Sequence, residues 1–458
     1  MSTKNKLERS SVSSSDEHSL RNELLESVEG VRSTKKLINL LDGSTSKRRQ
    51  QLLHCVSASS FRKSHARRFF ACVLTFLEPI VEHELFVPDN DDGYEHDDGA
   101  LEALNFMKVV SFTLTAYMEG LVQRRKDKHK DISVINEIFL VVERLHESLF
   151  SLQECGDKGV RVQTEIIRVC ELWWTENFMD RECVVVQLLP LLVARSLDES
   201  AQKTDVKRLL PLKEALDALD FDDESSADLK SLLLRTLSSP LFLKSNEGKK
   251  WIVEMFSIPA LASEMHQAIR IQIPDAKKTV LQAYGDIYFR SWKEGGNDVR
   301  AALEEFVLQD LAYASIHVAN PQMVKNLQTI LNPFYNAKKA PDVEKLLHRL
   351  FGPILWRSMS AANSRVRVNA AIVLAEVFPL QESAVHTGRA VQKGRETLEG
   401  LLTDDEPRVR VAGAEATARI LSTYWDVLPS SDIRILLNRK FSPPVSVLLA
   451  QTQLQLTP

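Results

Sequence analysis

The chain has 458 residues, and its 58 Lys and Arg against 62 Asp and Glu give a formal net charge of −4. This near balance excludes a strongly basic nucleic-acid-binding protein, so any contact with nucleic acid must come from local basic clusters. Only 16 glycines and 17 prolines occur, which disfavours turn-rich all-β folds and glycine-rich phosphate-binding folds and favours helices.

The cysteines and the apolar segments bear on compartment and membrane. Five cysteines include no C-x-x-C pair, so a disulfide framework and a zinc knuckle are both disfavoured. The amino end has no apolar stretch typical of a signal peptide, and the strongest apolar run, 184–194, is interrupted by Pro190. A transmembrane helix needs about 20 apolar residues. We therefore expect a soluble, intracellular protein in a reducing compartment, with no membrane partner.

The chain divides into five predicted segments. Residues 1–20 are rich in serine and charge and lack a repeating apolar face, so we expect a disordered tail. A helical amino-terminal region is predicted for 21–87, followed by an acidic loop at 88–99. From 100 to 437, apolar residues recur at steps of three and four, which is typical of amphipathic helices, and no alternating strand pattern is found. The pattern is lost at 438–458, where we expect an irregular tail and a truncated chain.

A repeat in the carboxyl half is the sharpest pattern. The segments that begin at Ser364 and Pro407 share the letters R-V-R-V followed by small and apolar residues, and their Val-Arg pairs lie 43 residues apart. This period falls within the roughly 40–47 residues of HEAT and armadillo repeats, in which helix pairs bury their faces against neighbouring units. We predict an all-α solenoid of HEAT-like repeats, degenerate in the amino half and clearest at 341–425. Structural repeat residues are Val366, Arg367, Ala370, Asp404, Val409, Arg410 and Gly413.

One acidic residue distinguishes the two copies of the repeat. Asp404 lies five residues before Val409, whereas the first copy has Ala361 at that place. In HEAT proteins such an Asp typically bonds along the stack to the Arg of the Val-Arg pair. Arg410 is therefore predicted to have a structural role and not to bind a ligand.

Motifs for catalysis and metal binding are not found in the sequence. The glycines form neither a P-loop nor a G-x-G-x-x-G motif, and no H-E-x-x-H pair occurs among the eleven histidines. The acidic loop fails the EF-hand pattern at both ends, with Pro88 at the first ligand position and Gly99 at the twelfth. We expect no enzyme activity, metal, cofactor or small-molecule substrate. A helical enzyme is the least favoured class.

Basic residues form two clusters. Five cations occur within residues 124–130, and a second group lies at 47–68. Each cluster alone is typical of a solvated helix end, but together they favour contact with nucleic-acid phosphates or a nuclear import signal. The candidate DNA contacts are Arg124, Arg125, Lys126, Lys128 and Lys130, followed by Arg365 and Arg408.

Residues 347–379 carry more than a generic repeat. The segments LHRLFGPILWR at 347–357, ANSRVRVNAA at 362–371 and EVFP at 376–379 resemble the G-type HEAT-repeat subunit of condensin II. Further similar elements follow in the order of that family, namely LWW at 172–174, LDALDFDD at 216–223, IYFRSWK at 287–293 and DDEPRVR at 404–410. The resemblance spans residues 130–435 and implies the amino-terminal part of such a subunit.

The resemblance implies a non-catalytic regulatory scaffold in the nucleus, on chromosomes. In that family the solenoid binds the kleisin subunit and, through it, a pair of SMC ATPases in mitotic chromosome condensation and segregation. It also implies contact with the backbone of double-stranded DNA in chromatin, without reading of sequence. The alternative is a generic α-solenoid adaptor, of the transport-receptor or phosphatase-scaffold type, that binds peptides. A ladder of exposed aromatic or Asn residues at matching repeat positions would favour it, and none is evident in the sequence.

Overall fold

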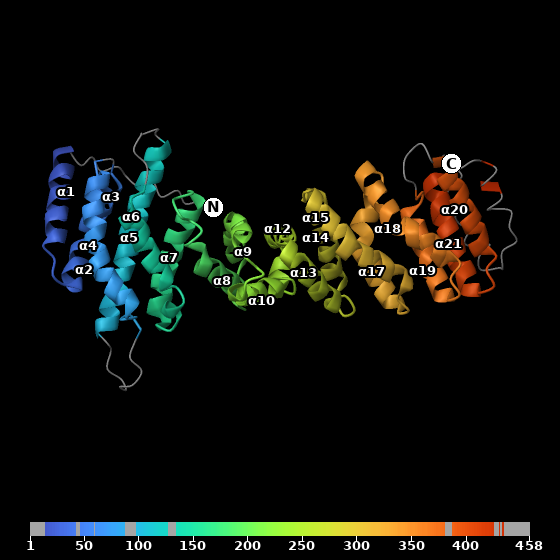
Figure 1. Cartoon of the computed structure of the whole chain (residues 1–458), viewed down its shortest axis with the longest axis horizontal. Coiled ribbons are helices and arrows are strands. Elements are labelled where there is room, and N and C mark those ends of the chain that lie inside the picture. The colour runs from blue at the N-terminus through green and yellow to red at the C-terminus, as the bar shows by residue number, and fades with distance from the viewer. Residues whose placement is uncertain are drawn as a thin grey trace, which may run out of the picture. The chain divides into compact units, whose positions relative to one another are not determined.

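The computed structural model describes residues 14–42, 46–58, 60–87, 98–126, 134–380 and 387–425, with the single positions 430, 433 and 434. Within these residues all regular structure is helical and no strand occurs. The chain divides into two compact units (Figure 1). Unit 1 comprises Met1–Ala201 and Pro211–Leu219, and unit 2 comprises Gln202–Leu210 and Asp220–Pro458. This division falls inside the range 100–437 that we expected to be a single solenoid.

Unit 1 is a stack of helices whose core is rich in aromatic rings. Phe61, Phe69, Phe70 and Tyr117 are buried and meet edge to face, with ring centroids between 5.1 and 6.1 Å apart. Edge-to-face contacts add to the stabilisation from burial alone. The helices are α1 (Ser14–Glu29), α2 (Thr34–Asp42), α3 (Ser46–Ser57), α4 (Lys63–Glu82), α5 (Asp98–Lys126), α6 (Asn136–Glu147), α7 (Gly156–Thr175) and α8 (Val185–Ser196).

The amino-terminal helix begins inside the segment expected to be a disordered tail. α1 starts at Ser14, because Leu24, Leu25 and Val28 form a buried apolar face on a helix that packs against α4 and that can propagate back into the polar residues. Residues 1–13 lie outside the described part of the chain. So do 88–97 of the acidic loop, since α5 begins at Asp98, and the carboxyl tail 438–458.

Unit 2 is a stack of helix pairs. It contains α9 (Lys203–Leu209), α10 (Ala227–Thr236), α11 (Pro240–Lys244), α12 (Asn246–Met255), α13 (Pro259–Gln272), α14 (Lys278–Glu294), α15 (Asn297–Ala302), a π-helical turn η4 (Leu303–Leu308), α16 (Gln309–His317), α17 (Pro321–Asn336), α18 (Pro341–Met359), α19 (Ser364–Val377), α20 (Thr387–Leu402) and α21 (Pro407–Tyr424). Short 3₁₀ helices are η1 (Ser151–Gln153), η2 (Leu210–Ala218) and η3 (Glu224–Ser226).

The 43-residue spacing extends further towards the amino terminus than the R-V-R-V segments indicate. The second helices of four successive repeats begin 43 residues apart, at Lys278, Pro321, Ser364 and Pro407. Their first helices are α13, the run α15–η4–α16, α18 and α20 (Figure 1). The prediction of an all-α solenoid of HEAT-like repeats is confirmed. The regular part begins at Pro259, where the R-V-R-V letters are absent but the spacing is kept.

Close helix contacts explain why small residues recur in the stack. A Cβ atom placed on Gly285 of α14 would lie 2.5 Å from the carbonyl oxygen of Ile330 on α17. At Gly413 of α21, a Cβ atom would lie 2.8 Å from the Cβ of Leu401 on α20. Real Cβ atoms do not approach other atoms so closely, so both positions need glycine for the helices to pack at this distance.

Candidate partner-binding surfaces

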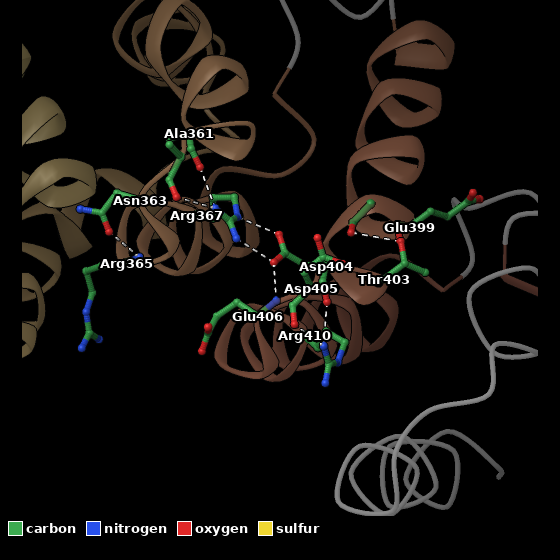
Figure 2. Close-up of polar contacts among 12 residues, drawn as sticks. Ala361, Asn363, Arg365, Arg367, Glu399, Thr403, Asp404, Asp405, Glu406 and Arg410 are labelled. Carbon is green, nitrogen blue, oxygen red and sulfur yellow. Dashed lines mark hydrogen bonds and ion pairs between the residues drawn. The ribbon is translucent and has the colours of Figure 1, made fainter.

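A charged pair joins the last two repeats (Figure 2). Arg367 on α19 donates from Nε to Oδ2 of Asp404 at 2.7 Å and from Nη2 to Oδ1 at 2.8 Å. Asp404 lies in the turn that precedes α21, in the following repeat. Only 16% and 13% of the two side chains are exposed. A two-pronged, largely covered contact of this kind is the strong form of an Arg–carboxylate pair, so both residues hold the repeats together.

The carboxylate of Asp404 has a second task within its own repeat. It accepts a hydrogen bond from the backbone N–H of Glu406 at 2.9 Å, which ties down the turn before α21. The hydrogen bond from Arg367 is the main cause that holds the pKa of Asp404 below its usual range. The joint therefore stays ionised through the neutral pH range.

Arg410 makes a different contact from the one the repeat pattern predicts. Its Nη1 donates to the carbonyl oxygens of Asp404 and Asp405, at 2.7 and 3.0 Å. Arg367 donates in the same way to Ala361 and Ala362, at 2.7 and 3.1 Å (Figure 2). Each arginine thus ties the turn before its own helix, and the carboxylate expected beside Arg410 pairs with Arg367 of the preceding repeat.

The apolar members of the predicted repeat set lie in the core. Val366 and Ala370 are buried on α19, and Val409 and Gly413 are buried at the equivalent places on α21. These side chains are therefore unavailable to a partner.

Two further arginines lie next to this joint in the sequence. Arg365 and Arg408 lie 43 residues apart, one residue before the buried valines. The Arg365 side chain points away from the Arg367–Asp404 pair in Figure 2, and Arg408 is exposed. Within the described residues neither guanidinium has a hydrogen-bond or ion-pair partner. Both stay candidates for contact with phosphate.

The basic cluster 124–130 divides into residues with different surroundings. Arg124 is half-buried, donates to the carbonyl oxygens of Gly120, Ala58 and Phe61 at 3.1 to 3.3 Å, and lies over the ring of Tyr117. These contacts give Arg124 a role inside unit 1 that competes with binding to DNA.

The next positions of the cluster are more open. Arg125 donates to the carbonyl oxygen of Glu176 at 2.6 Å and lies over the ring of Phe178. Lys126 is exposed, whereas Lys128 and Lys130 lie outside the described residues. Lys126 is therefore the described member of the cluster that is best placed to meet phosphate.

Two asparagines that the sequence patterns do not single out join the upstream repeats. Asn326 on α17 donates from Nδ2 to the carbonyl oxygen of Ile273 at 2.8 Å. Asn369 on α19 donates to Ile316 and Val318 at 2.9 and 3.0 Å. Both side chains are buried, so this pair is not the exposed Asn ladder of a peptide-binding adaptor. Its signal in the sequence is only the 43-residue spacing between two asparagines.

Aromatic residues also recur at the repeat spacing, on the first helices. Tyr313 on α16 is 52% exposed and stacks on His317 with ring centroids 3.9 Å apart. Trp356 on α18, 43 residues later, is half-buried and carries the Nζ of Lys393 4.5 Å from its ring centroid. Matching aromatic positions are therefore present, although no such ladder is evident from the sequence.

A polar cluster around the buried His266 brings together side chain types found in catalytic sites. His266 contacts the hydroxyl of Tyr288 at 3.0 Å through Nδ1 and Asp310 at 3.2 Å through Nε2, and Arg270 pairs with Asp310 at 3.1 Å. Burial lowers the pKa of His266, so the ring is neutral at physiological pH. The imidazole is covered on all sides, and the cluster holds α13 against α14 and α16.

The described residues contain no group of three or more His, Cys, Asp or Glu side chains that could hold a metal ion. The five cysteines are free thiols. Among the described helices, none combines the length and apolar character that a membrane span requires.

Comparison with known proteins relates the chain to one family. The model of a family described as "Condensin II non structural maintenance of chromosomes subunit" matches residues 235–382. Condensin-2 complex subunit G2 of Mus musculus is 31% identical over 314 residues, covering 65% of this chain and 27% of that protein. The Homo sapiens protein of the same name is 32% identical over 320 residues, covering 67% and 28%. The chain spans about a quarter of the length of the curated relatives that it matches.

Among solved structures, that of Kap121p has a TM-score of 0.37 and 14% sequence identity, covering 96% of this chain and 45% of that one.

The family match at 235–382 includes α13 to α19, where the 43-residue spacing and both Asn joints lie.

Proposed function

This chain is a relative of the condensin-2 G2 subunits, as its resemblance predicts, and we propose that it is a non-catalytic scaffold that binds the kleisin subunit and the backbone of duplex DNA. The proposal places it in the nucleus, on chromosomes, in mitotic condensation and segregation. The observation that carries it is the family match over 235–382, which coincides with a regular stack of helix pairs. Through kleisin the scaffold meets the SMC ATPase pair, to which the chemistry of ATP is assigned.

A scaffold role accounts for how the chain uses its polar side chains. The joints between repeats use the side chains of Asn326, Asn369, Arg367 and Asp404. The buried His266 bonds to Tyr288 and Asp310 of neighbouring helices. These groups hold helices in register, which is what a stacked repeat requires. The exposed surface of the same helices is then available to partner proteins.

Contact with DNA is assigned to those candidate cations that have no partner among the described residues, Lys126, Arg365 and Arg408. The sequence adds Lys128 and Lys130, which lie outside the described residues. Cations that neutralise phosphates bind duplexes of any sequence, and their contribution falls as salt rises. Arg124 and Arg125 are weaker candidates because their guanidinium groups already bond to carbonyl oxygens.

The experiment that tests the proposal is affinity capture of the tagged chain from nuclear extract, with the recovered proteins identified by mass spectrometry. We expect a kleisin together with both SMC ATPases. The matched control is a tagged helical-repeat protein of similar net charge, which should recover neither. Recovery of no kleisin, by a chain whose far-UV circular dichroism shows it to be helical, would overturn the proposal.

A second candidate is the α-solenoid adaptor that binds peptides. The observation that favours it is the pair Tyr313 and Trp356 at equivalent repeat positions, with Phe306 nearby on η4 at 59% exposure. If the adaptor reading holds, the double variant Tyr313→Ala/Trp356→Ala loses the captured proteins altogether. If the chain acts in condensin II, the same variant keeps its kleisin.

A further inference from the structure

A groove of about 500 Å³ lies in unit 2, between the segment that joins α14 to η4 and the amino-terminal half of α18. It falls within the range matched by the family model. Six of its nine lining residues have polar or charged side chains, unlike the apolar interfaces between neighbouring helices. The polar lining residues are Asn297, Arg300, Glu304, Asp342, Lys345 and Arg349.

Both carboxylates of the groove are already neutralised. Glu304 pairs with Arg349, whose Nη2 lies 2.7 Å from Oε2 and whose Nε lies 3.0 Å from the same oxygen. Asp342 pairs with Nζ of Lys293 at 2.6 Å. These two ion pairs build the walls and add no net charge.

Two cations of the groove are not neutralised. Arg300 donates from Nε to the carbonyl oxygen of Trp292 at 2.9 Å and from Nη2 to that of Lys293 at 2.6 Å. A carbonyl oxygen orients a guanidinium group but does not cancel its charge. Lys345 is exposed and has no hydrogen-bond or ion-pair partner among the described residues. The charged lining residues alone sum to one positive charge, and Lys293, which pairs with Asp342 from outside the lining, raises the excess to two.

The Arg300 side chain is also fixed in place before any ligand arrives. Besides its two carbonyl contacts, its guanidinium carbon lies 5.3 Å from the centroid of the Trp292 ring. That ring is held in turn by a hydrogen bond from Nε1 to Glu304 at 2.9 Å. A donor that is already ordered loses little conformational entropy when it binds, which favours affinity.

The groove offers acceptors as well as cations, and this decides between two kinds of anionic ligand. Both oxygens of Glu304 already accept hydrogen bonds from Arg349 or Trp292, but the side-chain oxygen of Asn297 has no partner among the described residues and can accept an N–H donor. A nucleic-acid backbone supplies acceptors only, whereas an acidic polypeptide supplies carboxylates for the cations and backbone N–H groups for Asn297.

We propose that this groove docks an acidic segment of a partner protein, whose carboxylates contact Arg300 and Lys345. The inference adds a binding site to the proposed scaffold function. It rests on that function only because it requires a protein partner.

The test measures fluorescence anisotropy of a labelled short peptide of alternating Glu and Ser, titrated with the full chain at low salt. We expect binding that Lys345→Glu weakens about tenfold or more, because a cation is replaced by a like charge. The matched control is Lys325→Glu, an exposed lysine of α17 in the same unit, which should bind as the wild type does. Thermal unfolding of both variants checks that they are folded.

Three results would overturn the proposal. One is equal binding by wild type and Lys345→Glu, and another is equal binding of a peptide with Gln in place of Glu. The third is a DNA duplex that displaces the peptide and whose own affinity depends on Lys345, which would make the groove a phosphate site. Capture of kleisin from extract by the wild-type chain is measured separately. The proposal for the groove can therefore be refuted while the proposed scaffold function is supported.

Discussion

Asn326 and Asn369 lie 43 residues apart and make the same contact, each donating its side-chain amide to a carbonyl at the carboxyl end of the first helix in the repeat before it, Ile273 and Ile316, at 2.8 and 2.9 Å. The last carbonyls of a helix lack partners within the helix, and leaving them unpaired in the interior is costly. One asparagine therefore completes the end of one repeat from the side of the next.

Replacing Asn369 tests this joint. We expect Asn369→Ala to lower the free energy of unfolding of unit 2 by about 2 kcal/mol, because two buried carbonyl oxygens lose their donor. Urea unfolding followed by circular dichroism measures the change. The control is Asn332→Ala, at an exposed position of α17, which should be neutral. Equal stability of wild type and Asn369→Ala would contradict the role given to this contact.

Replacement of glycine by alanine is expected to change stability in opposite directions at two positions. Gly285→Ala places a Cβ against the Ile330 carbonyl and is expected to destabilise unit 2 by about 1–3 kcal/mol. Gly400→Ala, on α20, meets no atom within 4 Å and should stabilise the helix by up to about 1 kcal/mol. Chemical denaturation of both variants compares them. The packing argument fails if the two substitutions shift stability in the same direction.

The ion pair between Arg367 and Asp404 predicts a measurable coupling. Each single substitution, Arg367→Ala or Asp404→Ala, is expected to cost about 1–2 kcal/mol, and the double variant less than their sum. Arg408→Ala, on the exposed side of α21, is the control and should be close to neutral. A double-mutant cycle from urea unfolding gives the coupling energy, and strict additivity would show that the pair does not join the repeats.

Unit 1 contains a histidine that predicts sensitivity to acid. His146 accepts a hydrogen bond at Nε2 from the backbone N–H of Gln187 at 3.1 Å, and burial lowers its pKa to about 4. In the unfolded chain the ring binds a proton near pH 6.5. Between these values the unfolded state holds more protons, so its contribution is complete above pH 6.5 and is lost as pH falls towards 4, by up to about 3 kcal/mol.

Pulse proteolysis in urea at several pH values, with fragments of unit 1 identified by mass spectrometry, measures this loss. His146→Gln should flatten the dependence on pH over that range. His54→Gln, at an exposed position, should keep it. A wild-type profile that does not change between pH 7 and pH 5 would refute the assignment.

Charge reversal at the end of α5 tests DNA contact. The triple variant Lys126→Glu/Lys128→Glu/Lys130→Glu should weaken binding of duplexes of unrelated sequence to a similar degree and reduce the slope of log affinity against log salt. Arg124 is left unchanged because its contacts with Ala58 and Phe61 serve folding. An unaltered salt slope, measured by anisotropy with a labelled duplex, would remove this cluster from the interface.

Helical periodicity and a repeated R-V-R-V segment suffice to predict the fold class and the last two repeats. The upstream repeats cannot be recognised in this way. They keep the 43-residue spacing and the buried asparagines that packing requires, but they lack the R-V-R-V segment. Local pattern also cannot separate Arg124 from Lys126, since their difference arises from carbonyl groups of Ala58 and Phe61, more than 60 residues away. Asp404 is foreseeable as a joint residue, but its partner depends on how neighbouring repeats stack.

The change of chemistry along the stack has a consequence for how it responds to ions. The joints built on Asn326 and Asn369 are neutral amide contacts, which dissolved salt hardly affects, whereas the joint of Arg367 with Asp404 is an ion pair that salt weakens. Because only 16% and 13% of the Arg367 and Asp404 side chains are exposed, salt screens this pair less than the more exposed pairs Lys293–Asp342 and Arg349–Glu304 upstream. Raising the ionic strength therefore acts first on the exposed ion pairs around α18, while the joint of α19 with α21 persists.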